Sequence, residues 1–188
     1  MTRAICGITL FTLLLVGCAP ASERCAWLDR DARYCLQPTH TTTPMDQRQR
    51  LDLRLGGEQH TLLADVWVDA EQQQLVLVTP LGQTVAQLVF DNHSARLQGP
   101  PTPWPTPLPP AALLAMVQIA WWPASQVQAG LDEGWTLLDS PGVRTLRAPH
   151  AASDWLQIQY EPQSGPARRV KMRLPQRAME MDIEVLAP

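Results

Sequence analysis

The sequence lacks the motifs that would indicate an enzyme. Its four histidines share no metal-ligand spacing, and it has neither a Gly-x-Ser-x-Gly elbow nor a glycine-rich phosphate loop after a strand. Asp91, His93 and Ser94 could be a fragment of a hydrolytic triad. Polar residues in a hairpin loop are, however, more often turn formers. We therefore expect no enzymatic activity, no cofactor and no metal site.

The chain also lacks a strong excess of charge of either sign. It carries 15 basic and 18 acidic residues. Loss of a leader that contains Arg3 would make this balance slightly more acidic. Clustered basic charge supplies most of the affinity of proteins for nucleic acid and for anionic membrane surfaces. The composition therefore argues against nucleic acid as a partner and against a purely electrostatic attachment to a membrane.

No apolar run is long enough to cross a bilayer. The N-terminal run covers residues 5–16, whereas a spanning helix needs about 20 apolar residues. A basic residue, a short apolar run and small residues after it are together typical of a secretory signal peptide. We expect residues 1–17 to be this signal peptide, and the alternative is a transmembrane anchor.

The residues Leu15-Val16-Gly17-Cys18 resemble the bacterial lipobox. This resemblance implies that Cys18 becomes the first residue and carries acyl chains such as palmitate, which anchor a protein without spanning the membrane. The residue directly after Cys18 is Ala19 and not an Asp. In the class of bacterial lipoproteins that this sequence resembles, this implies sorting to the outer membrane of a Gram-negative bacterium. The protein would then face the periplasm on a flexible leader of residues 18–46.

Cysteine is scarce, with four residues in the whole chain. Cys6 would leave with the signal peptide and Cys18 would be acylated, so Cys25 and Cys35 would remain in an oxidising compartment. Their spacing suits neither a Cys-x-x-Cys redox motif nor a zinc site. We expect them to form a disulfide that staples the leader, and the alternative is two free thiols.

Apolar residues recur with a period of two over much of residues 47–188, which predicts one domain of antiparallel strands. The expected strands cover residues 50–55, 62–68, 75–78, 84–90, 95–98, 155–160, 169–174 and 179–186. Seven prolines between residues 100 and 110 predict an extended crossover. Residues 111–122 and 126–131 predict helices. The expected fold is mainly β (α+β), with a strongly curved sheet covered by short helices.

Residues 77–84 contain a Thr-Pro-Leu-Gly turn, and alternating strands, an apolar helix and closing strands follow. This order resembles the outer-membrane lipoprotein receptor LolB and its soluble relative LolA over residues 48–186. It is still more similar to an uncharacterised lipoprotein family of that superfamily, often encoded beside aryl-polyene biosynthesis genes. The resemblance implies an unclosed half-barrel whose hydrophobic cavity takes acyl chains from a periplasmic LolA-like carrier.

Large apolar residues of the helix and strands are candidates for lining this cavity, because tryptophan and methionine offer wide, adaptable apolar surfaces. The candidates are Trp67, Phe90, Leu114, Val117, Trp121, Trp122, Ile158, Met172 and Met181. The alternative is that these residues fill a solid core. The protein would then be an accessory or scaffold lipoprotein of a cell-envelope biosynthetic or transport system, without a transfer role.

Leu81 stands in a turn whose geometry Pro80 and Gly82 supply, so the turn itself does not call for a leucine. The matching turn of LolB carries a protruding leucine that inserts cargo into the membrane, and the resemblance implies this role for Leu81. The alternative is that Leu81 folds back onto a neighbouring element. We expect a monomer whose partners are outer-membrane lipid and a LolA-like carrier or its cargo.

Overall fold

The computed structural model describes residues 24–28, 30, 32–98, 109–150, 153–163 and 165–186. The expected signal peptide, Cys18 and most of the proline-rich crossover lie outside these residues. Among the described residues, those of the hydrophobic core cluster lie between Ala26 and Ile183. A chain that starts at residue 19 therefore contains all of these described core residues.

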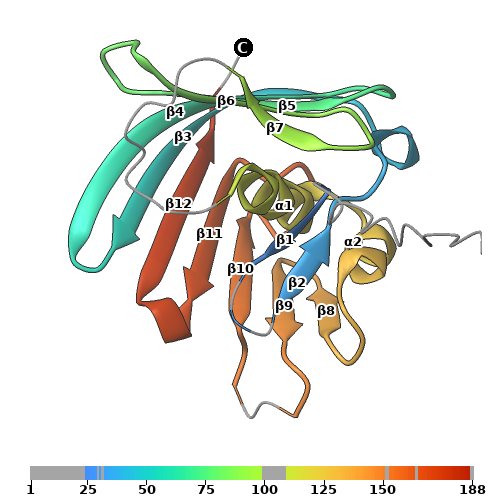
Figure 1. Cartoon of the computed structure of the whole chain (residues 1–188). Helices are drawn as coiled ribbons and strands as arrows, with labels where there is room; N and C mark the ends of the chain where they lie inside the picture. Colours follow the sequence, from blue (N-terminus) through green and yellow to red (C-terminus); the bar gives the residue numbers. More distant parts are fainter. Residues whose placement is uncertain are drawn as a thin grey trace, which may run out of the picture.

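Ten strands of the described chain form one antiparallel sheet in the order β7-β6-β5-β4-β3-β12-β11-β10-β9-β8. Their bounds are β3 Met45–Leu55, β4 Glu58–Val68, β5 Gln73–Val78, β6 Thr84–Phe90, β7 Ala95–Gln98, β8 Thr136–Ser140, β9 Val143–Arg147, β10 Leu156–Glu161, β11 Arg169–Leu174 and β12 Met179–Val185. The pairing of β3 with β12 joins two antiparallel meanders. The end strands β7 and β8 do not pair, so the sheet curves without closing (Figure 1).

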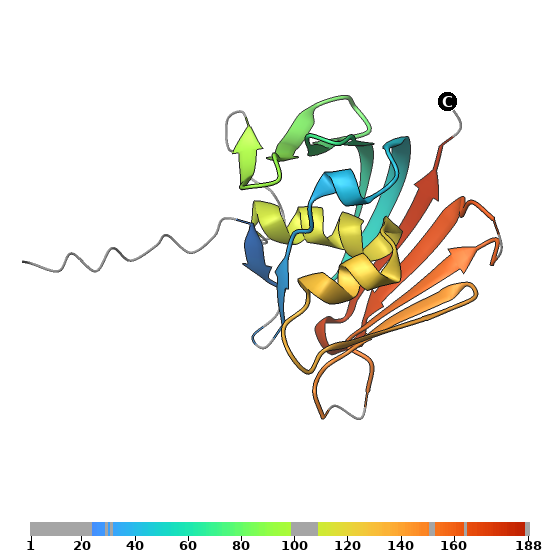
Figure 2. The same ribbon diagram turned by 90° about the vertical axis from the view of Figure 1, so that its right-hand side faces the viewer.

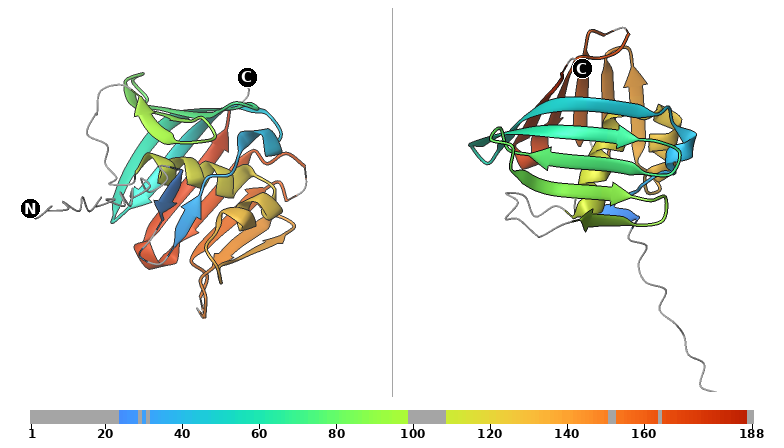
Figure 3. Two further views of the ribbon diagram at one scale, coloured as in Figure 1. Left: turned by 45° about the vertical axis from the view of Figure 1, so that its right-hand side comes forward. Right: turned by 90° about the horizontal axis from the view of Figure 1, so that it is seen from above.

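The sheet bends around α1 Pro110–Trp121, which lies on its concave side (Figures 1 and 2). The short helix α2 Ala124–Gly130 packs beside β8. A two-stranded hairpin, β1 Cys25–Trp27 and β2 Arg33–Cys35, lies beside α1 on the open side of the sheet (Figure 3). This architecture confirms the expected mainly β fold, with an unclosed curved sheet covered by short helices.

The composition of α1 accounts for its bounds and its position. Pro110 occupies the first turn, where a missing N–H leaves no intrahelical bond unmade, and Pro123 prevents continuation at the other end. A helix that is apolar nearly all round is stable in water only when most of its sides are covered. Eight of the twelve residues of α1 are buried. The expected helix over residues 111–122 is thus shifted by one residue.

The sequence predicts no strand between residues 131 and 155, and this expectation is wrong. The hairpin of β8 and β9 occupies that stretch and forms one end of the sheet. Its opposed residues include Asp139 with Arg144, next to the apolar pair Leu137 and Leu146. Arg144 is buried and its partner Asp139 is exposed. Because these two charged residues stand where a strand pattern would place apolar ones, the period-two apolar pattern that marks a strand is absent.

The segment expected to be a flexible leader is partly built into the core. Tyr34 and Leu36 are completely buried, and Tyr34 also forms a β-bridge with Leu131, which follows α2. The gap between β7 and β8 leaves one side of α1 uncovered, and the β1–β2 hairpin covers that side. The leader therefore contributes to the stability of the domain.

Candidate functional site

An apolar pocket of about 330 Å³ lies between the concave face of the sheet and α1. Sixteen of its eighteen lining residues are apolar, and the other two are Gln49 and Arg177. The apolar residues are Leu51, Leu53, Leu55, Leu62, Ala64, Leu75, Leu77, Leu113, Met116, Val117, Ala120, Trp121, Met172, Met179, Met181 and Ile183. The volume lies at the lower end of the range of about 300–1,000 Å³ that is usual for small-molecule sites.

The side of the pocket formed by the sheet includes apolar side chains of β3 and β12, which alternate with charged side chains along both strands. Leu53 on β3 lies opposite Met181 on β12, and both line the pocket. Successive side chains of a strand point to opposite faces. The charged residues between the lining positions therefore lie on the outer face of the sheet, where Arg54 pairs with Glu180 at 3.7 Å.

The pocket is not filled by its own side chains. Six of its apolar lining residues keep accessible surface although they pack against the core, namely Leu51, Leu55, Leu113, Val117, Trp121 and Met181. Protein cores normally leave few voids larger than a water molecule. Accessible apolar surface that is gathered in one concavity is therefore a candidate binding site rather than a packing defect.

The C-terminal turn of α1 is fastened to the sheet by two polar side chains. Nη1 of Arg144 donates hydrogen bonds to the carbonyls of Ile119 and Trp122, both at 2.8 Å. The hydroxyl of Tyr160 donates to the carbonyl of Ala120 at 2.6 Å. Burial raises the pKa of Tyr160 to about 12, so its hydroxyl keeps its proton at neutral pH. These bonds satisfy carbonyls that a helix end leaves unpaired, and they hold α1 as a fixed roof over the pocket.

A buried amide network ties the middle of α1 to the leader and to β5. Oε1 of Gln118 accepts hydrogen bonds from the Tyr34 hydroxyl at 3.1 Å and from the Gln37 N–H at 2.8 Å. Nε2 of Gln118 donates to Oε1 of Gln73 at 2.9 Å and to the Gln37 carbonyl at 3.1 Å. Burial raises the pKa of Tyr34. Buried amides are tolerated where their hydrogen bonds are made, so this network fixes the position of α1.

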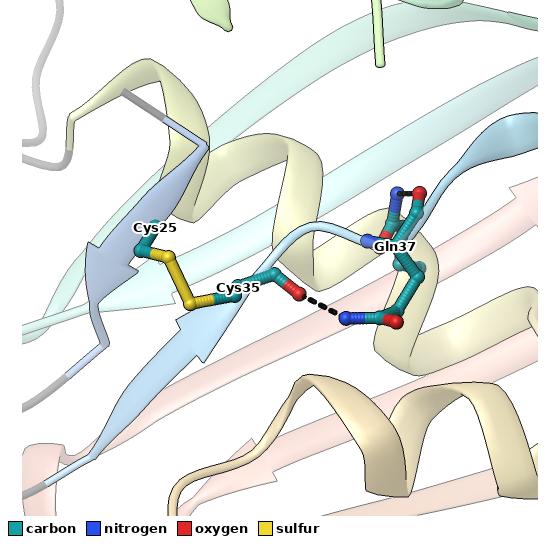
Figure 4. Close-up of a disulfide and its surroundings, with 4 residues drawn as sticks. Cys25, Cys35 and Gln37 are labelled. Atoms are coloured by element: carbon teal, nitrogen blue, oxygen red, sulfur yellow. Dashed lines mark hydrogen bonds between the residues drawn. A yellow bond between two sulfur atoms is a disulfide. The ribbon is translucent and has the colours of Figure 1, made fainter. Parts of the chain in front are cut away.

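The expected Cys25–Cys35 disulfide is present, and it joins directly opposed residues of β1 and β2 (Figure 4). Nε2 of Gln37 donates to the Cys35 carbonyl at 2.7 Å, next to the bridge (Figure 4). A cross-link over a loop this short stabilises a protein by about 3 kcal/mol in the chain-entropy model. The bridge therefore holds together the hairpin that covers α1.

Residues 46–187 match a family described as "Protein of unknown function (DUF3261)". The chain belongs to the DUF3261 family. No curated protein matches the sequence. The match begins within β3, so the DUF3261 region contains the curved sheet, both α-helices and the pocket, while the β1–β2 hairpin precedes it.

Four of the nine residues expected to line a cavity do line the pocket of this DUF3261 protein. They are Val117, Trp121, Met172 and Met181. The first two lie on α1, and the others lie on β11 and β12. The helix and the closing strands thus contribute to the pocket from opposite sides.

Phe90, Leu114, Trp122 and Ile158 do not line the pocket, which corrects the expectation for these residues. Each is at most 1% exposed and fills the core. The reason is that α1 is covered on most of its sides, so only one of its faces borders the pocket. Leu114 and Trp122 belong to the faces that pack against the rest of the protein.

Trp67 corrects the expectation in another way, because it lies on the outer face of the sheet and is 39% exposed. Its neighbours on β4, Val66 and Val68, are each 1% exposed and point inward. The alternation of side chains along a strand then directs Trp67 outward.

The sequence analysis did not predict the aliphatic and polar residues that line the pocket. The leucines of β3, β4 and β5 form much of the lining, and their period-two pattern was a signal that could have identified them. Arg177 follows β11 in a short 3-10 helix, Pro175–Arg177. No local pattern indicates that this arginine lies beside a cavity.

Leu81 is 89% exposed at the turn between β5 and β6. The N–H of Gly82 donates to the Thr79 carbonyl at 2.9 Å, so Pro80 and Leu81 occupy the two central positions of a β-turn. Gly82 has φ +81°, a conformation that glycine adopts without strain. The alternative in which Leu81 folds back onto a neighbouring element is therefore wrong.

Asp91, His93 and Ser94 form a turn between β6 and β7. Oδ1 of Asp91 accepts hydrogen bonds from the N–H groups of Ser94 at 2.8 Å and His93 at 3.1 Å. The bond from Ser94 is the main cause that lowers the pKa of Asp91, and Arg96, at 2.9 Å, acts in the same direction. These contacts are those of a turn-forming aspartate.

None of the helices formed by the described residues is long and apolar enough to cross a membrane. No group of three or more histidine, cysteine, aspartate or glutamate side chains in the part of the chain that the structure describes is placed to hold a metal ion.

Proposed function

We propose that this protein is a LolA/LolB-like outer-membrane lipoprotein. Its pocket binds an acyl chain of a lipid or lipoprotein and helps that cargo enter the outer membrane. The observation that carries this proposal is the accessible, almost purely apolar lining between α1 and the sheet. Each methylene that leaves water for such a surface gains about 0.8 kcal/mol, part of which offsets the entropy lost on binding.

The hydrogen bonds that hold α1 in place support the proposal that the binding pocket is preformed. Bonds from Arg144, Tyr160 and Gln118 hold the helix at its C-terminal end and middle, so the pocket does not have to open by lifting the helix as a lid. A preformed pocket binds without an ordering cost in the protein. The proposed partners are outer-membrane lipid and a LolA-like carrier or its cargo, and the protein acts as a monomer.

Native mass spectrometry of residues 19–188, produced with the disulfide intact, tests the binding proposal. We expect the protein to carry a co-purified lipid, or to take up a fluorescent acyl probe that hexadecanoate displaces. A purified protein that contains no lipid and binds no acyl probe would contradict acyl-chain binding. It would favour the accessory scaffold lipoprotein as the function.

The proposed anchor is tested at Cys18. We expect the precursor with Cys18→Ser to remain uncleaved and to take up no labelled palmitate, because the lipobox cysteine is the site of acylation. Metabolic labelling, followed by separation of precursor and mature forms, measures both effects. Processing at Gly17 with labelling equal to that of the parent would contradict the lipoprotein proposal.

We assign to Leu81 the role of a membrane-contacting finger. An exposed leucine on a rigid turn gains free energy by entering the apolar part of a bilayer. We expect Leu81→Glu to change the stability of residues 19–188 by less than about 0.5 kcal/mol, because the side chain has little to lose in the folded state. Binding to vesicles of phosphatidylethanolamine and phosphatidylglycerol should fall several-fold, as measured by co-sedimentation.

Gln83→Glu is the matched control for this variant, since Gln83 is also exposed and lies two residues away at the same turn. It adds the same charge near the tip but keeps the leucine. An equal loss of vesicle binding in both variants would show that charge repulsion is responsible. Vesicle binding of Leu81→Glu equal to that of the parent would rule out the finger.

A further inference from the structure

Arg177 is the one charged residue among the described residues that line the apolar pocket. It ends the 3-10 helix between β11 and β12, is exposed, and lies two residues before Met179. Met179 pairs with Leu55 at the tip of the β3–β4 hairpin. Arg177 therefore marks the end of the pocket that lies nearest this hairpin tip.

The other polar lining residue, Gln49, marks the opposite end. It is 3% exposed and lies opposite Val185 at the far end of the β3–β12 pairing. Leu55 follows Gln49 by six positions along β3, a length of about 20 Å at the usual rise along a strand. One leaflet of a bilayer is about 15 Å of hydrocarbon thick, half of the bilayer core. The pocket is thus long enough for one extended acyl chain.

The volume of the pocket limits the number of chains. About 330 Å³ is near the minimum for a small-molecule site. It suits a single slender chain along β3 better than the several chains of an acylated lipoprotein. The polar end of such a chain would lie at the end of the pocket where a hydrated group can remain in water, beside Arg177.

We propose that the pocket binds a single-chain amphiphile whose anionic head, a carboxylate or a phosphate, pairs with Arg177. This inference rests on the proposed acyl-chain binding and specifies the ligand of the same pocket. The planar guanidinium of arginine offers paired N–H donors that match the oxygens of either anion. The remaining lining is apolar apart from Gln49. An anionic head group would therefore meet a cation only at Arg177, and the acyl chain would lie against the apolar residues.

The test compares three ligands of equal chain length: hexadecanoate, hexadecyl phosphate and hexadecanol. Each is titrated against residues 19–188 by displacement of a fluorescent acyl probe. We expect both anions to bind at least about fivefold more tightly than the alcohol. Arg177→Gln should remove this preference by weakening the binding of both anions more than that of hexadecanol. A preference for one anion over the other distinguishes a free fatty acid from a phosphate-bearing lipid.

Arg54→Gln is the control, since Arg54 is an exposed arginine on the outer face of β3 that pairs with Glu180. It should keep the preference for anions. Equal binding of all three ligands by the parent would overturn the anionic head and leave acyl-chain binding intact. A preference that survives Arg177→Gln would also overturn the inference. Failure of all three ligands to bind would contradict the proposed function itself.

Discussion

Arg144→Ala is expected to lower the free energy of unfolding by about 3 kcal/mol. The Arg144 side chain is 9% exposed, and its Nη1 supplies hydrogen bonds to two carbonyls at the end of α1. Hydrogen bonds from charged groups are worth about 1.5–3 kcal/mol each, and a buried acceptor left unpaired adds a desolvation cost. The ion pair with Asp139 contributes less, because that carboxylate is 38% exposed and screened by water.

Urea unfolding of residues 19–188 measures this loss. Arg147→Ala is the matched control on the same strand, because Arg147 is 46% exposed and forms an ordinary surface ion pair with Asp154 at 2.9 Å. It should cost less than about 1 kcal/mol. A loss below about 1 kcal/mol for Arg144→Ala would show that the end of α1 is not fastened through this side chain.

Ala64→Phe is expected to reduce the affinity for hexadecanoate more than tenfold. Ala64 is 1% exposed and lines the pocket from β4, opposite Gln49 on β3 and Leu77 on β5. A phenyl ring at this position would occupy space that the acyl chain needs. Because the ring enters an existing cavity, the loss of stability should stay at the low end of the 1–3 kcal/mol typical of overpacked cores. Displacement of a fluorescent acyl probe measures the affinity.

Leu63→Phe is the control for Ala64→Phe, because Leu63 is the next residue of β4 and points to the other face of the sheet. It should leave the affinity for hexadecanoate unchanged. Met181→Trp gives a second obstruction from a half-buried position across the pocket. Unchanged binding by both obstructing variants, with both still folded, would place the ligand outside the pocket.

Local patterns predicted much of the sheet. The bounds of β6, β7 and β11 agree with the predicted strands, and α1 differs by one residue. Prolines or turn residues bound these elements, and β6, β11 and α1 also have a clear apolar pattern. The hairpin of β8 and β9 was not predicted, because the opposed charged residues Asp139 and Arg144 interrupt its apolar pattern. That pair is stable only where α1 presents its carbonyls to Arg144, and no local pattern reveals such a contact.

The candidate site was predicted only in its general place, beneath the apolar helix. Aromatic residues were chosen for their size, yet Trp122 fills the core and Trp67 faces outward. Size alone does not tell which face of a buried helix borders a cavity, because α1 is apolar nearly all round apart from Gln118. The leucines of β3 to β5 belong to the predicted period-two pattern, but their role as lining follows only from the pocket between the sheet and α1.

The sequence by itself determined the strand periods, the Pro-Leu-Gly turn and the helix between two prolines, and it predicted the pairing of Cys25 with Cys35, since each depends on residues close together in the chain. Only the tertiary structure decided what depends on distant segments meeting. In the folded protein, the β1–β2 hairpin packs beside α1 in the gap between β7 and β8. Arg144 forms hydrogen bonds with the end of α1, and Arg177 lies beside the pocket. Burial and helix-end hydrogen bonds made across the fold set these features, and they leave no periodic mark in the sequence.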